Sequence, residues 1–449
     1  MRSWTAGLTR SSSPTCSGSH DGVDGVAKIP QLRRCTASFV TGKTLTAQGP
    51  EQCAHCGSCT AVCPVYRVSG RESLTARGKL HLLGTPFAAV PSPVFQDLFA
   101  QCLLCGACEK ACPRGLPIRD LIVGTRSRFP VISGRHGLRK AAARFALARP
   151  VLLEGLVQAG LLLNSLSLLP ADSGLRLKLG LLAQGRTGGP VGEDAPPIEQ
   201  AAGEEGIQYF AGCLARYLQP SVAQATGRLV QGLAGKSLLA PNAQACCGLA
   251  AWSSGDKEEA QRLAKRNILA FAGSSGPILT SCASCSAHLA KYPELFAGDD
   301  EWREQAAQFS ARVREFSSFI LAAAGTAVLQ TREERRVYYH QPCHLRFDPA
   351  NSEAAGQLLR AVANVSVAEP EAGPQCCGQG GLFHLGYPEL TEKIFAKAEA
   401  ACAAATADLV VTSCSGCLLQ WQSGLALRHS PLPAVHLAVF LASCLDINS

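Results

Sequence analysis

Two runs of four cysteines constrain this 449-residue chain more than any other feature of its sequence. Each run has the spacing C-x2-C-x2-C-x3-C and is followed directly by proline, at Pro64 and Pro113. Three thiolates at this spacing wrap one [4Fe–4S] cubane, while the fourth cysteine of each run binds the other cubane. We therefore expect two cubanes in one small domain, the first held by Cys53, Cys56, Cys59 and Cys112, and the second by Cys102, Cys105, Cys108 and Cys63.

Zinc is the alternative occupant, because it accepts four thiolates and often uses C-x2-C pairs. A tetrahedral zinc site, however, has no use for three evenly spaced cysteines and a fourth before proline. Gly57 and Gly106 follow the second cysteine of each run, where the lack of a Cβ relieves a tight turn. The pattern favours iron over zinc at both sites.

The composition agrees with a metal-binding globular chain. Hydrophobic residues make up 47% and charged residues 17% of the chain, and its 22 cysteines lie mostly in tight clusters, which favours metal ligands over disulfides. The formal charge of +8 counts every cysteine as neutral. A cubane held by four thiolates adds roughly two negative charges. The basic excess can therefore offset clusters, and we expect no nucleic-acid partner.

An internal repeat occupies the C-terminal half. Each copy contains a single cysteine, then a Cys-Cys-Gly segment that we call the CCG motif, then a C-x2-C pair. In both copies 32 residues separate the first cysteine from the adjacent pair, which indicates a duplication. The candidate metal ligands are Cys213, Cys246, Cys247, Cys282 and Cys285 in the first copy, and Cys343, Cys376, Cys377, Cys414 and Cys417 in the second.

Short apolar runs directly precede the cysteines of both copies, and we interpret them as parallel strands. They cover residues 207–210, 277–280, 337–339 and 407–412. Helical patterns over residues 257–271 and 389–405 lie between them, so strands and helices alternate. An α/β fold binds its ligands at the carboxyl ends of its strands, where these cysteines stand.

The expected fold class is an α+β multidomain chain, with a helical two-cluster ferredoxin-type domain followed by two tandem α/β cysteine-rich domains. The dicluster domain has helical periodicity over 74–83. In the Leu-rich connector, residues 151–169 contain Glu154, Gln158 and Asn164, so we expect a buried or docking helix rather than a membrane span. The expected parts are a disordered tail over 1–45, the dicluster domain over 46–128, a helical connector and linker over 129–204, and CCG domains over 205–330 and 331–449.

Five thiolates in each copy exceed the needs of one tetrahedral zinc or one cubane. Adjacent cysteines can bind two irons of one cluster, so one or two further iron–sulfur centres are expected, with buried thiols or zinc as alternatives. Nearby histidines are structural, or donate hydrogen bonds to a cluster or substrate. They are His288, His340, His344 and His384, and the cysteines outside every motif, expected to be free thiols, are Cys16, Cys35, Cys402 and Cys444.

The motif order resembles a known family. The CCG spacing is similar to that of the heterodisulfide reductase B subunit, in which it holds a non-cubane [4Fe–4S] centre. From Gln52 onward the chain resembles the iron–sulfur subunit of glycolate oxidase and its lactate-utilisation and anaerobic glycerol-3-phosphate dehydrogenase relatives. The matching strings are CAHCGSCTAVCPVY with the following ARGK, CLLCGACEKACPRG, and CCGQGG. In that family the first C-x2-C can be degenerate, whereas both copies are complete here.

The resemblance implies an electron-transfer subunit of an oxidoreductase complex, whose own enzyme status stays open. A separate FAD-dependent subunit would oxidise a 2-hydroxy acid such as glycolate or lactate, and this chain would pass the electrons to a quinone or another acceptor. We expect no flavin on this chain, because the GQGG segment at 378–381 lacks a dinucleotide-binding context. The alternative is a catalytic subunit that reduces a disulfide at a CCG-bound cluster. The expected location is cytoplasmic, at the inner face of the cell membrane if the connector docks there.

Overall fold

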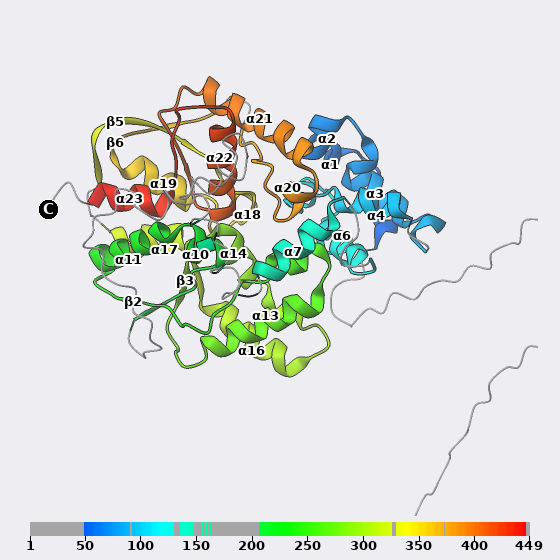
Figure 1. The fold of residues 1–449 in the computed structure, drawn as a ribbon, viewed down its shortest axis with the longest axis horizontal. Coiled ribbons are helices and arrows are strands. Elements are labelled where there is room, and N and C mark those ends of the chain that lie inside the picture. The colour runs from blue at the N-terminus through cyan, green and yellow to red at the C-terminus, as the bar shows by residue number, and fades with distance from the viewer. Residues whose placement is uncertain are drawn as a thin grey trace, which may run out of the picture. The chain divides into compact units, whose positions relative to one another are not determined.

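The computed structural model describes residues 49–89, 92–129, 135–147, 206–325, 329–371 and 373–445, with a few isolated residues between 149 and 162 (Figure 1). The tail expected over 1–45 lies outside the described residues. The linker and nearly all of residues 151–169 in the Leu-rich connector lie outside them as well. Among the residues described, none of the helices combines the length and apolar character that crossing a bilayer requires.

The N-terminal part consists of short helices around the two cysteine runs. Gly57 and Gly106 have φ near +82°, in the left-handed region that side chains with a Cβ disfavour. Each of these glycines directly precedes a short helix, so the turns expected at both positions are confirmed. The elements are η1 (Pro50–Gln52), α1 (Ser58–Ala61), α2 (Pro64–Ser69), η2 (Glu72–Leu74), α3 (Ala76–Leu83), η3 (Pro86–Ala88), α4 (Pro93–Ala100), α5 (Ala107–Lys110) and α6 (Ile118–Arg126).

The helix expected over 74–83 begins two residues later than its periodicity indicates. The Thr75 hydroxyl accepts a hydrogen bond from the Gly78 amide at 3.1 Å and so caps α3. The residues just before the cap form the single turn η2. Side-chain capping, rather than the apolar pattern, therefore sets the start of this helix.

The first repeat folds around a four-stranded parallel sheet with the order β2-β1-β3-β4. The strands expected before Cys213 and Cys282 are β1 and β3, and the helix expected over 257–271 is α13. Its elements are β1 (Ile207–Tyr209), α10 (Cys213–Leu218), α11 (Pro220–Ala234), β2 (Leu238–Leu239), α12 (Leu249–Ser254), α13 (Lys257–Ala270), β3 (Ile278–Thr280), α14 (Ala283–Leu289), α15 (Tyr292–Leu295), α16 (Asp300–Arg312), β4 (Val313–Glu315) and α17 (Phe316–Ala324).

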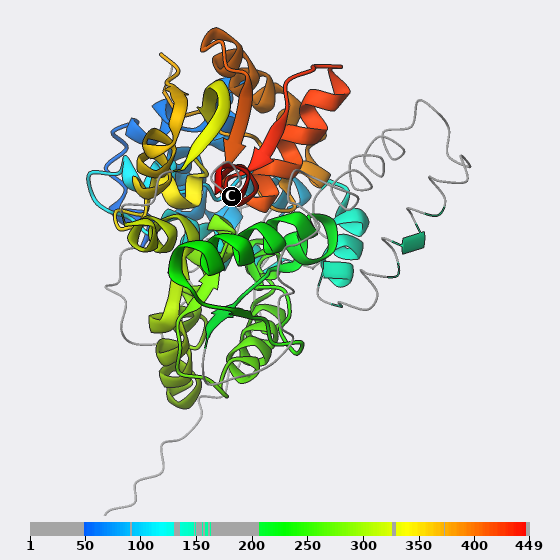
Figure 2. The ribbon, with the colours of Figure 1, turned by 90° about the vertical axis from the view of Figure 1, so that its left-hand side faces the viewer.

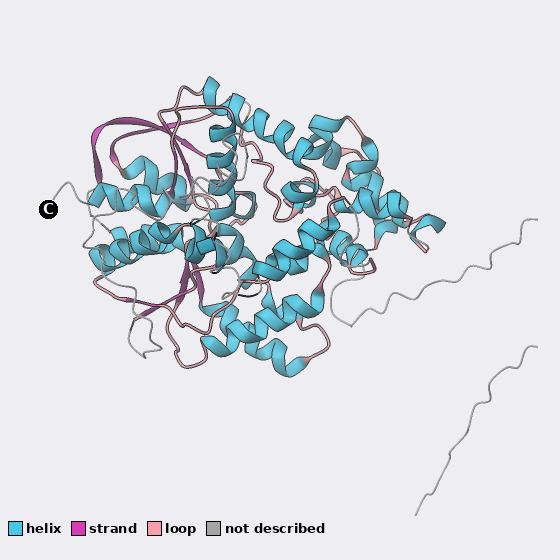
Figure 3. Ribbon diagram, in the orientation of Figure 1, coloured by secondary structure: helices cyan, strands magenta, loops and turns pink. Residues whose placement is uncertain are grey.

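The second repeat has the corresponding order, β6-β5-β7-β8, and its strand pairs are also parallel. This agreement confirms the expected tandem α/β architecture. Helices lie beside the strands of both sheets, and the longest strand is the ten-residue β5 (Figure 3). The elements are β5 (Gln330–Tyr339), α18 (Cys343–Arg346), α19 (Ala354–Ala361), β6 (Ala363–Ala368), α20 (Phe383–Gly386), α21 (Pro388–Ala404), β7 (Leu409–Thr412), α22 (Ser415–Leu427), β8 (Ala434–His436) and α23 (Leu437–Leu445).

The two repeats share one buried layer of helices. In that layer α11 packs on α23, and α17 packs on α19, so the last helix of each repeat contacts the other repeat. Leu229, Phe316, Leu358 and Phe440, one from each of these helices, belong to a single apolar cluster. Figures 1 and 2 show the green first repeat directly against the yellow-to-red second repeat. This pairing holds the cysteine-bearing strand ends of the two sheets together.

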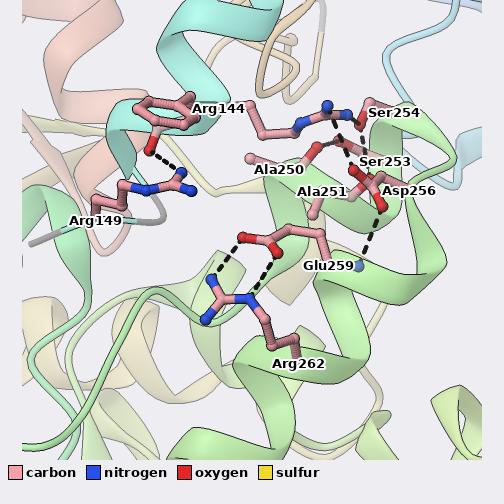
Figure 4. Close-up of polar contacts among 10 residues, drawn as sticks. Arg144, Arg149, Ala250, Ala251, Ser253, Ser254, Asp256, Glu259 and Arg262 are labelled. Carbon is pink, nitrogen blue, oxygen red and sulfur yellow. Dashed lines mark hydrogen bonds and ion pairs between the residues drawn. The ribbon is translucent and has the colours of Figure 1, made fainter. Parts of the chain in front are cut away.

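The described part of the connector is α7 (Gly137–Leu147), which is tied to the first repeat. Arg144 donates to the Ser254 hydroxyl at 3.0 Å and forms an ion pair with Asp256 at 3.3 Å (Figure 4). Asp256 also caps α13 by accepting from the Glu259 amide at 3.1 Å. Arg144 therefore fastens the connector to the residues that begin α13.

Candidate iron–sulfur sites

The first three cysteines of the first run and the last cysteine of the second run line one cavity near the surface. Gly57 and Arg77 belong to the same lining. Cys56 is exposed, the only exposed cysteine among those described, and the described cysteines are all free thiols. The structure thus gathers the four residues predicted for the first cubane, namely Cys53, Cys56, Cys59 and Cys112.

The four thiols predicted for the second cubane also lie near one another. Burial raises the pKa of Cys105 to about 12, and the neighbouring Cys102 and Cys63 add to the effect by charge repulsion. Burial likewise raises the pKa of Cys108, and repulsion from Cys102 and Cys105 raises it further. Several buried thiolates this close require a compensating positive charge. The donor set therefore fits the iron–sulfur cluster that the spacing predicts.

In the first CCG site, the Sγ atoms of Cys213 and Cys246 are 3.6 Å apart. Because the Cys213 thiol donates to Cys246, the pKa of Cys246 is lowered and that of Cys213 is raised. Cys247 contacts Cys285, which in turn contacts Cys282. All five cysteines predicted for this site therefore form one connected group at the carboxyl ends of β1 and β3.

Two polar side chains that the sequence analysis missed hold the adjacent cysteines of this site. Asn267 accepts from the Ala245 amide at 2.7 Å and donates to the Cys246 carbonyl at 3.0 Å. Tyr292 donates to the Cys247 carbonyl at 2.9 Å. Both side chains are buried. Asn267 is a polar residue on a helix face that is otherwise directed at the core. That position was the one signal in the sequence that could have identified it.

In the second CCG site, the Sγ atoms of Cys377 and Cys417 are 3.5 Å apart. Ligand atoms of His340, Cys377 and Cys417 all lie within 4.8 Å of one another. Contact with Cys417, and then with His340, lowers the pKa of Cys377. Cys376 accepts from the Gly378 amide at 3.4 Å. His340 is thus a buried histidine that faces the predicted ligands directly.

The two CCG sites meet at the boundary between the repeats. The Sγ atoms of Cys282 and Cys414 are 3.9 Å apart. The Ser284 hydroxyl lies 3.2 Å from the Cys414 sulfur and 3.0 Å from Nδ1 of His344. The Ala283 amide donates to the Ser413 carbonyl at 3.0 Å, which fixes the two C-x2-C segments against each other. The two groups of five cysteines therefore adjoin.

A small cavity joins the dicluster domain to the second CCG site. Cys105 lines it from one side, and Cys343 and Cys376 line it from the other. Arg346 in the cavity wall donates to the carbonyls of Gln341, Pro374 and Gln375 at 2.9–3.0 Å. Arg346 thereby anchors the segment that leads into the second CCG motif. It is another residue that the sequence analysis did not single out.

The remaining predicted side chains have different environments. His288 is buried between Trp252 and Tyr292, with ring centroids 5.7 and 5.8 Å away. His384 is half-buried, and its Nδ1 donates to the Gly381 carbonyl at 2.7 Å. Cys402 and Cys444 are buried apart from the predicted sites, while Cys16 and Cys35 lie outside the described residues. The ligand roles of the cysteines in all four sites stay predictions.

Comparison with known proteins supports this arrangement. A model for a 4Fe–4S dicluster domain matches residues 49–116, and one for a cysteine-rich domain matches residues 207–290 and 337–422. The probable glycolate oxidase iron–sulfur subunit of Bacillus subtilis is 30% identical over 418 residues, covering 87% of this chain and 92% of that protein. The glycolate oxidase iron–sulfur subunit of Escherichia coli is 26% identical over 380 residues, covering 81% and 88%.

A shorter relative matches about half of the chain. Lactate utilization protein A of Shouchella clausii is 29% identical over 237 residues, covering 53% of this chain and 98% of that protein. The fold and the thiol clusters define an iron–sulfur protein, with a dicluster domain followed by two cysteine-rich domains. Within that class, the chain belongs to the family of glycolate oxidase iron–sulfur subunits and is an iron–sulfur subunit of an oxidoreductase.

Proposed function

We propose that this chain passes electrons from an FAD-dependent 2-hydroxy-acid dehydrogenase subunit, of the glycolate or lactate type, to a quinone or another acceptor. The names of its relatives supply the substrate class and imply a catalytic partner subunit. The proposal assigns two [4Fe–4S] cubanes to the dicluster domain and one further cluster to each CCG repeat. Iron–sulfur clusters supply one-electron transfer when they are bound.

The proposal rests on one observation: three of the four thiol sites adjoin one another, and the remaining site lies in the same small domain as one of them. Only the first dicluster site includes an exposed thiol, Cys56, among the cysteines described. The second adjoins the second CCG site through the cavity shared by Cys105 and Cys343. That site in turn meets the first CCG site at Cys414 and Cys282. Such a row of closely spaced sites suits a relay.

The chain's own side chains hold and orient these sites. The cysteines supply thiolates, and Asn267 and Tyr292 fix the adjacent pair Cys246 and Cys247 through its backbone carbonyls. Most cysteines of both repeats are buried, so the predicted centres are largely shielded from water. A site held rigidly away from water changes little on reduction, which favours rapid electron transfer.

The test separates the relay from hydroxy-acid chemistry. Purified anaerobically by itself, the chain should contain no flavin and should not oxidise glycolate or lactate with an artificial acceptor. With its co-expressed flavoprotein subunit, adding the hydroxy acid should bleach the visible absorption of the iron–sulfur centres. Oxidation of either acid by the isolated chain would refute the relay.

The contact between the CCG sites favours a second candidate, a catalytic subunit that reduces a disulfide at a CCG-bound cluster. Two electrons and two protons would convert one disulfide into two thiols, and adjoining sites at Cys282 and Cys414 could supply both electrons. A viologen-reduced chain that turns over a disulfide without the flavoprotein would favour this function. Turnover only with the flavoprotein and a hydroxy acid would favour the relay.

A further inference from the structure

Lys79 is a lysine that the fold buries beside the predicted ligands of the second cubane. It lies on α3 between the two cysteine runs and is 1% exposed. Its Nζ donates to the carbonyl of Leu74 and, at 3.4 Å, to that of Gln101, the residue before Cys102. Burial lowers the pKa of Lys79, whereas the nearby Cys102 and Cys63 thiolates raise it. An anionic cluster therefore favours the charged form of this lysine.

Arg126 approaches the same loop from α6. Its Nη2 atom donates to the carbonyls of Phe99, Ala100 and Cys102 at 2.9, 3.2 and 2.8 Å. The guanidinium also donates to the carbonyl of Ser253 in the first repeat. Two cations thus hold the backbone that carries Cys102, the first predicted ligand of the second cubane.

The cations beside the dicluster sites differ in how they are paired. Arg77 at the first site forms an ion pair with Glu72 at 2.5 Å, and Arg119, which lies against Gly106 of the second run, forms one with Glu109 at 2.6 Å. In the part of the chain that the structure describes, Lys79 and Arg126 have carbonyl acceptors but no carboxylate within ion-pair distance. Burying a cation without an anion is costly. The thiolates of the second site are the negative charge that this pair of cations faces.

We propose that Lys79 and Arg126 are the counter-charges of the second cubane and raise its reduction potential above that of the first. Reduction adds one negative charge to a cubane, so a nearby cation stabilises the reduced form. Burial by itself opposes that added charge. The attraction between these cations and the reduced cluster outweighs the cost of burial, because it is also strongest where water is excluded. Charges that are paired or exposed are largely screened.

The consequence is a direction for electron flow. Electrons that enter at the exposed first site move toward the second, whose residue Cys105 adjoins the second CCG site. Lys79 and Arg126 are positioning residues in this account, since they set the charge around the cluster and bind no metal. The inference depends on the predicted cubane ligands but not on the identity of the flavoprotein partner or the substrate.

The test is a redox titration of the full chain, prepared anaerobically and followed by electron paramagnetic resonance. The signal that Cys105→Ser removes identifies the second cubane. In the unmodified chain this signal should appear at the higher potential. Lys79→Met should shift the potential of the second cubane to a more negative value and leave the potential of the first unchanged. Lys79→Arg should restore the potential of the second cubane. The matched control is Lys110→Met, at an exposed lysine beside Cys112, which should shift neither cluster.

An unchanged second potential in Lys79→Met, or equal shifts of both cubanes, would overturn the proposal. If Lys79→Met fails to retain the second cluster, the iron content decides. Retention in Lys79→Arg but not in Lys79→Gln indicates a requirement for charge and supports the proposal. Loss in both variants indicates a requirement for shape and overturns it. The titration needs no partner protein, so failure of the relay in reconstitution would leave this result standing.

Discussion

The sulfur atoms of Cys282 and Cys414 lie 3.9 Å apart, although 132 positions separate the two residues in the chain. Each begins the C-x2-C pair of its own repeat, and each follows the corresponding strand, β3 or β7. The duplicated domains are therefore joined at their predicted metal sites as well as through their shared helices. A change at this contact should reach both sites.

This contact gives the first prediction. Cys414→Ser should alter the spectroscopic signals of both CCG centres, because Cys414 touches Cys282 as well as its own repeat. Cys376→Ser is the matched control and should alter one set of signals, since Cys376 faces the cavity shared with the dicluster domain. Mössbauer spectra of iron-57-loaded protein would measure both effects. Identical changes in the two variants would contradict the prediction.

The second prediction concerns the crossed ligands of the cubanes. Cys112 lines the cavity of the first run, and Cys63 is close to Cys102. Cys112→Ser should therefore disturb the cluster held mainly by the first run, and Cys63→Ser the cluster held by the second. Electron paramagnetic resonance of the reduced variants would distinguish the two clusters. The opposite pattern of loss would show that the ligands are not crossed.

Local patterns in the sequence predicted much of the fold. The apolar runs before Cys213, Cys282, Cys343 and Cys414 are parallel strands. Their cysteines stand at the carboxyl ends of those strands because that edge of a parallel sheet is where its loops converge. The glycines in the cysteine runs were also predictable, since a positive φ disfavours other residues.

The contacts between distant segments could not be predicted in the same way. Ser284 meets His344 and Cys414 only because the repeats pack face to face, and no spacing within either repeat encodes that approach. Lys79 looks like an ordinary polar position on a short helix, yet its amine is enclosed by carbonyls from two segments. Such sites depend on tertiary packing rather than on local periodicity.

The third prediction is that Trp421 supports the second CCG site. Its buried ring lies 5.0 Å from Phe395 and 5.5 Å from His340, measured between centroids. Trp421→Ala should reduce the free energy of unfolding by about 3–5 kcal/mol, through the cavity it leaves. The control Leu427→Ala, at a residue 57% exposed on the same helix, should change it by about 0.5 kcal/mol or less. Urea unfolding would measure both, and similar losses would contradict the prediction.

The fourth prediction is a pH dependence from Glu315, a buried carboxyl at the end of β4. Burial raises its pKa, although the Ser317 hydroxyl and the Ser318 amide donate to Oε2 at 2.5 and 3.0 Å. The folded state therefore holds this proton more tightly than the unfolded state. Its contribution to stability is complete below the ordinary carboxyl pKa and is lost as pH rises through the raised value.

Glu315→Gln should remove this dependence and increase stability at neutral pH, because the amide oxygen can still accept both hydrogen bonds. The control is Glu301→Gln, at an exposed carboxyl on α16. Urea unfolding midpoints would be measured between acidic and neutral pH. Only for Glu315→Gln should the difference from the midpoint of the unmodified chain disappear at low pH. A constant offset at every pH would show that the buried charge does not set the dependence.

The last prediction is the iron content. If both CCG repeats bind clusters in addition to the dicluster domain, fully reconstituted protein should contain about sixteen irons, against about eight with the dicluster domain alone. Replacing Cys376 and Cys377 together should lower the count by about four. The difference is large enough to survive incomplete loading.

Alkylation provides an independent check on the same question. Thiolates bound to iron are shielded from reagents, whereas metal-free thiols react according to their exposure and pKa. Cys213 and Cys343 are both partly exposed, so they are the informative positions in the two repeats. They should resist alkylation in loaded protein and react once a chelator has removed the iron. Rapid modification of both in anaerobically prepared protein that holds about eight irons would leave the CCG repeats as docking domains and confine the relay to its two cubanes.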